Sequence, residues 1–74
     1  MSEKRAKFVE LAEARVSRAI KQIRLIGNLS NRSSYEYNDE DIRQIFAALQ
    51  RELEVAKSRF DAAGNASSKR FRLE

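Results

Sequence analysis

Apolar residues recur with a helical period in two long segments of the chain. In the first, residues 3–26, the spacing alternates between three and four at Val9, Ala12, Val16, Ala19, Ile23 and Ile26. In the second, residues 39–63, the same alternation occurs at Ile42, Phe46, Leu49, Leu53, Ala56, Phe60 and Ala63. Such spacing places each set on one face of a helix. The pattern therefore predicts two amphipathic helices, each with one apolar seam.

The first helix has a start signal and a stop signal. Ser2 is a favourable N-cap residue, and no residue from Glu3 to Ile26 breaks a helix. Gly27 follows, and glycine commonly ends a helix in the left-handed conformation. We therefore expect a helix over residues 3–26 that ends at Gly27.

The second helix begins with an acidic cap. Asn38, followed three residues later by Asp41, is a variant of the capping box. The carboxylates of residues 39–41 also suit the positive end of the helix dipole. A metal site is the alternative, but consecutive helical residues point in different directions, which favours capping. Gly64 is the expected end, so this helix should cover residues 39–63.

The connector, residues 27–38, lets the second helix fold back along the first. Folding back sets Val9 opposite Phe60 and Ala12 opposite Ala56, and small residues meet large ones in most layers. The predicted fold class is therefore all-α: a two-helix antiparallel hairpin, residues 1–63, with a connector of about a dozen residues.

Several apolar residues lie outside the two seams. They are Leu11 and Leu25 in the first segment and Ile45, Ala48 and Val55 in the second. A single hairpin of this size stabilises itself poorly, and further apolar surface is usually covered by another hairpin. We expect a homodimer that forms a four-helix bundle, or a higher helical oligomer.

Residues 64–74 continue neither seam. Lys69, Arg70 and Arg72 surround Phe71, which predicts a flexible basic tail. Such a tail either aids solubility or makes weak contacts with nucleic acid or an acidic membrane. The last two residues, Leu73 and Glu74, resemble a vector-derived scar.

Composition excludes several kinds of chemistry. The 74-residue chain has no Cys, His or Pro, so disulfides and Cys- or His-based metal sites are excluded, as is the commonest general base. No serine has a base nearby, so we expect no catalytic residues, no cofactor and no enzymatic activity. No apolar run is long enough for a membrane span, and no signal-peptide pattern opens the chain. A cytoplasmic protein is the expectation.

The net charge of +4 is unevenly distributed. Residues 1–27 carry seven basic and three acidic side chains, whereas residues 39–63 carry four basic and six acidic ones. Opposite the seam of the first helix lie Lys4, Lys7, Arg15, Arg18 and Lys21. This row predicts contact with the phosphate backbone of RNA or DNA. Leu11 and Leu25 interrupt it, so packing on a partner helix or a membrane surface stays open, as does a solvated face paired with the acidic second helix.

The connector is the second candidate site. Asn28, Asn31, Arg32, Ser33 and Tyr35 offer hydrogen-bonding groups, a planar cation and an aromatic face. This mixture suits a nucleotide, a phosphodiester or an acidic peptide. The alternative is an ordered turn, because Asn tolerates unusual backbone and Ser forms local turns.

Two functions follow from these patterns. The first is a small oligomeric binding module for an anionic ligand, nucleic acid or nucleotide, through the basic face and the connector. The alternative is a protein–protein interaction module, an adaptor or inhibitor with no nucleic-acid role. In that case Leu11, Leu25, Ile45 and Val55 would contact another protein.

Overall fold

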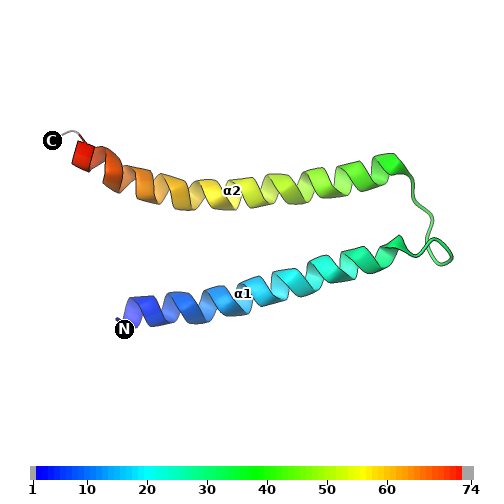
Figure 1. Ribbon diagram of the computed structural model, residues 1–74, viewed down its shortest axis with the longest axis horizontal. Coiled ribbons are helices and arrows are strands. Elements are labelled where there is room, and N and C mark those ends of the chain that lie inside the picture. The colour runs from blue at the N-terminus through cyan, green and yellow to red at the C-terminus, as the bar shows by residue number, and fades with distance from the viewer. Residues whose placement is uncertain (1, 73–74) are drawn as a thin grey trace. The chain divides into compact units, whose positions relative to one another are not determined.

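The computed structural model describes the backbone of residues 2–72 and the side chains of residues 2–64. It contains the α-helix α1 (Glu3–Gly27), the short 3₁₀ helix η1 (Asn28–Ser30) and the α-helix α2 (Asp39–Arg72) (Figure 1). No strand occurs in this described range, so the all-α prediction with two long helices is confirmed. Leu73 and Glu74, and the scar predicted there, lie outside the described residues.

The start of α1 is capped as the sequence predicted. Ser2 has extended backbone, and its Oγ accepts a hydrogen bond of 3.1 Å from the backbone N–H of Arg5. The Ser2 carbonyl accepts the first helical bond, 2.9 Å from the N–H of Ala6. Because the first N–H groups of a helix have no partner within it, this serine satisfies one that would otherwise depend on water.

The end of α1 differs from the prediction. Gly27 is the last residue of the helix and is right-handed, with φ −59° and ψ −31°. The N–H of Asn28 donates to the carbonyls of Arg24 and Leu25, and the chain tightens into η1. The left-handed cap predicted at Gly27 is wrong, because this 3₁₀ turn satisfies the last carbonyls without a positive φ.

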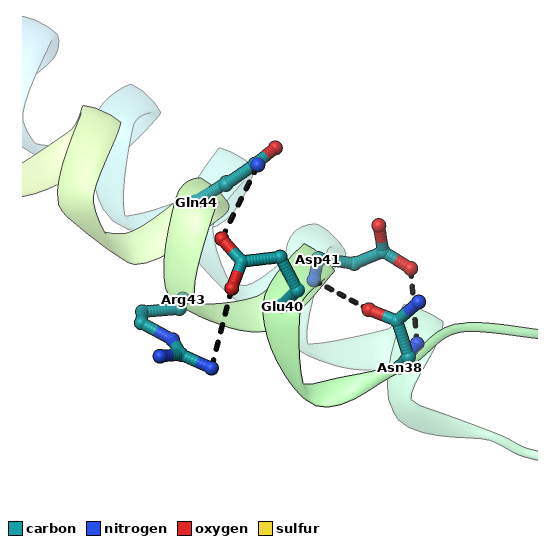
Figure 2. Close-up of polar contacts among 5 residues, drawn as sticks. All are labelled: Asn38, Glu40, Asp41, Arg43 and Gln44. Carbon is teal, nitrogen blue, oxygen red and sulfur yellow. Dashed lines mark hydrogen bonds and ion pairs between the residues drawn. The ribbon is translucent and has the colours of Figure 1, made fainter.

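The start of α2 is a reciprocal capping box (Figure 2). The Asp41 N–H donates to Asn38 Oδ1 at 2.8 Å, and the Asn38 N–H donates to Asp41 Oδ2 at 2.9 Å. Glu40 forms an ion pair with Arg43 at 3.3 Å and accepts a hydrogen bond from Gln44 at 3.3 Å. The capping interpretation of this acidic turn is therefore confirmed.

The second helix continues past Gly64 to Arg72. The sequence predicted an end at Gly64, but a glycine inside a helix costs only about 1 kcal/mol relative to alanine. The chain has no proline that would break the helix, so α2 continues to Arg72. The flexibility predicted for residues 64–74 stays a prediction.

Neither helix has a core of its own. The structure divides into two units, Met1–Glu36 and Tyr37–Glu74. Among the residues with described side chains none is buried, and seam residues such as Leu53 and Phe60 are 61% and 66% exposed. The helix–connector–helix order is that of a hairpin, and each helix presents its seam as a continuous apolar stripe.

The capping box gives a direct stability test. Replacing Asn38 with alanine removes the acceptor for the Asp41 N–H, so we expect a loss of about 1 kcal/mol in the free energy of unfolding. Urea denaturation followed by circular dichroism measures the loss. Asn38→Ser keeps an acceptor at the same position and should retain most of the stability. Equal stability of the alanine variant and the unmodified chain would contradict the role of this cap.

Candidate anion-binding site

The basic face of α1 is built by helical periodicity alone. Its five members, Lys4, Lys7, Arg15, Arg18 and Lys21, are all exposed. At about 100° per residue, they fall within a sector of about 120°. From Lys4 to Lys21 the row extends about 26 Å along the axis. The helix therefore presents these cations as one elongated surface.

The cations of this face are not engaged in ion pairs within the described part of the chain. The recorded ion pair there joins Arg43 to Glu40 on α2. The guanidinium of Arg5 lies 5.8 Å from the ring centre of Phe8, but Arg5 points away from the basic face. Within α1 the five cations are therefore exposed and form no ion pair.

Two leucines lie within the basic face. Leu11 is 36% exposed and Leu25 is 48% exposed. Leu11 separates Lys4 and Lys7 from the three cations that follow. The basic face therefore consists of two groups of cations with Leu11 between them. A phosphate backbone can contact the cations, and a partner helix can contact both the cations and the leucine.

The connector contains an ordered turn centred on Asn31. Its carbonyl accepts backbone hydrogen bonds from Ser34 at 3.1 Å and Tyr35 at 3.0 Å. Its side-chain Oδ1 accepts from the N–H and the hydroxyl of Ser33, at 3.0 and 2.6 Å. Its Nδ2 donates to Ser34 Oγ at 3.4 Å. This is the Asx-type turn that the alternative interpretation of the connector required.

These bonds change what the connector can offer to an anion. A phosphate needs donors, and Ser33 already donates its N–H and its hydroxyl proton to Asn31. Asn31 and Ser33 therefore hold the turn, and the side chains of Arg32 and Tyr35 are exposed on it. Asn28 lies apart from them, at the cap of α1.

Two local contacts were not predicted from the sequence. Ser34 contributes to the turn through the amide of Asn31, and Glu40 joins Arg43 and Gln44 on the first turn of α2. Both follow spacings of three or four residues, which was the available signal. No group of three acidic, His or Cys side chains within the described range is arranged to hold a metal ion.

The described helices also bear on the membrane question. None of them combines the length and the apolar character needed to cross a bilayer. The predictions of a cytoplasmic location and of no enzymatic activity stay predictions.

The turn can be tested by removing its acceptor. Asn31→Ala eliminates the Oδ1 that receives the Ser33 N–H, so the Ser33 amide should exchange with solvent several-fold faster. Asn31→Asp keeps the oxygen and should preserve the slower exchange. Amide hydrogen exchange by NMR measures both variants. Identical Ser33 exchange in the alanine variant and the unmodified chain would show that this bond does not order the connector.

Comparison of the chain with protein-family models, curated proteins and solved structures found no match.

Proposed function

We propose that the chain is a helical hairpin that self-associates and binds an anionic ligand, nucleic acid or nucleotide, through the basic face of α1. The assembly is a four-helix bundle or a higher helical oligomer. The observation that carries the binding proposal is the row of five exposed cations on one side of α1, without ion pairs in the described part of the chain. Arg32 and Tyr35 of the connector add a guanidinium and an aromatic face.

Self-association is supported by the exposed seams. Full burial of a Leu or Phe side chain contributes about 1.5–3 kcal/mol, and on α2 the seam residues Leu53 and Phe60 are more than half exposed. Most helical stability in proteins comes from packing an apolar face rather than from helix propensity. The seam of α1 would cover that of α2 in a hairpin, with Val9 opposite Phe60 and Ala12 opposite Ala56. Further copies would then cover the apolar residues outside the seams.

The charge distribution supports an anion approaching α1 rather than α2. The segment of α2 up to residue 63 carries more acidic than basic side chains, whereas α1 carries a clear basic excess. Phosphates are attracted by clustered Lys and Arg whatever the base sequence. We therefore assign the basic face to the phosphate backbone.

The exposure of Leu11 and Leu25 favours one rival function. Two leucines in a cationic face also suit an amphipathic partner helix of a different protein. Salt dependence separates the two functions. Phosphate binding weakens steeply as salt rises, whereas an interface anchored by apolar contacts tolerates salt.

Charge reversal in the basic face tests nucleic-acid binding. The unmodified chain should bind single-stranded RNA, duplex DNA or ATP at low salt. With about five phosphates neutralised, log K for duplex DNA should fall with log[salt] at a slope of about −4 to −5. Arg15→Glu with Arg18→Glu should weaken binding on the order of 100-fold at about 50 mM salt, measured by fluorescence anisotropy.

The matched control is Arg51→Glu with Lys57→Glu, which makes the same change in net charge on α2. It should weaken binding far less. Equal losses in the two double variants would mean that net charge, not the α1 face, drives the interaction. Absence of binding to all three probes at low salt would refute the proposed function.

A polar substitution in the α2 seam tests self-association. Phe46→Asp places a charge in the apolar seam and should abolish assembly, with loss of helicity measured by circular dichroism and a lower mass in sedimentation. Ala47→Asp puts the same residue on the polar side of α2 and should leave the assembly intact. An assembly that survives Phe46→Asp would contradict the role of the seam.

A further inference from the structure

A second row of residues runs along α2 beside the seam. Its spacing alternates between three and four at Ile45, Ala48, Glu52, Val55, Arg59 and Ala62, and we name it the outer stripe. Val55 is 51% exposed. Heptad spacing is the pattern of a helix that packs against another helix. The outer stripe differs from the seam in carrying two opposite charges among its apolar and small residues.

Neither charge of the outer stripe has an ion-pair partner among the described side chains of α2. Side chains three and four residues apart are the neighbours on a helix surface. For Glu52 these neighbours are Ala48, Leu49, Val55 and Ala56. For Arg59 they are Val55, Ala56, Ala62 and Ala63. No ion pair of either side chain occurs in the described part of the chain.

The first turn of α2 shows the opposite case. There Glu40 meets Arg43 and Gln44 at those spacings, at 3.3 Å each (Figure 2). Glu52 and Arg59 are exposed charges with apolar or small residues at these spacings, so another helix can supply an opposite charge that α2 itself does not.

A shallow groove lies on α2 where the outer stripe borders the seam. It is lined by Arg59 of the outer stripe and by the seam residues Ala56, Phe60 and Ala63. Arg59 supplies the only charge among these four residues. The occupant that fits is a helix with a carboxylate among apolar and small residues. The surroundings of Glu52 on α2 itself have that composition.

We propose that a second copy of α2 packs on the outer stripe in the antiparallel direction, with Glu52 of each copy facing Arg59 of the other. The two charges are one heptad apart, about 10.5 Å along the axis. A parallel pairing in register would place like charges together, whereas an antiparallel pairing places unlike charges together at both ends of the contact. The two-fold symmetry axis that relates the two copies of α2 then passes between Val55 and Ala56. This inference rests on the self-association proposed above and is independent of anion binding.

The ion pairs fix the direction of the contact more than its strength. Exposed pairs contribute little individually, and apolar contact by Ala48, Val55 and Ala62 supplies most of the affinity. Like charges facing one another in the parallel orientation would repel, which disfavours that alternative. The outer stripe is therefore self-complementary in one direction only.

Charge exchange in the full chain tests this arrangement. Glu52→Arg alone and Arg59→Glu alone should each raise the Kd of self-association about tenfold, measured by sedimentation equilibrium. An equimolar mixture of the two single variants should form a heterodimer with an affinity near that of the unmodified chain, because both contacts again join unlike charges. The double variant Glu52→Arg with Arg59→Glu should recover for the same reason.

Disulfide formation gives a second, independent test, since the chain has no cysteine. A mixture of Glu52→Cys and Arg59→Cys chains should form a crosslink between residues 52 and 59 under mild oxidation, and neither variant alone should crosslink efficiently. A parallel contact would instead crosslink Glu52→Cys chains with one another.

The outcomes separate this inference from the proposed function. Self-association that is unaffected by the single charge reversals, or crosslinks between identical positions, would overturn the antiparallel contact and leave the oligomer standing. A monomeric unmodified chain would overturn both the contact and the oligomer. Anion binding is measured separately, and its outcome tests neither the antiparallel contact nor the oligomer.

Discussion

A single amphipathic helix cannot bury its own apolar stripe, and this constraint governs the molecule. Each of the two helical units has a continuous apolar seam, and no described side chain in either unit is buried. The stability gained from these seams must come from contacts between helices, whether of one chain or of several copies. In the proposed assembly folding and association are linked, so the strength of association would determine how much folded protein exists at a given concentration.

Local chemistry explains why the helix starts were predictable and the helix ends were not. Ser2 and Asn38 provide acceptors for N–H groups that would otherwise lack a partner, and the structure uses both. A glycine permits a helix to end but does not force it to end. Gly27 passes into a 3₁₀ turn, and Gly64 lies within a continuing helix, because each costs little in helical conformation.

The candidate site, like the helix boundaries, was predictable only in part from the sequence. Helical spacing alone identified the basic face of α1, since which residues share a face depends only on sequence position. The connector was less predictable, because the same Asn and Ser side chains that suit a ligand also suit a turn. The structure shows Asn31 and Ser33 bonded to one another. The pairing of helices depends on contacts distant in sequence, and it follows from complementary surfaces rather than from local signals.

The dependence of thermal stability on protein concentration tests the link between folding and assembly most directly. Circular dichroism would follow the unfolding of the unmodified chain over a wide range of concentrations. If further copies stabilise the hairpin by covering the apolar residues outside the seams, the midpoint of unfolding should rise steadily with concentration. A helical chain that sediments as an 8.5 kDa monomer and unfolds at one temperature at all concentrations would contradict self-association.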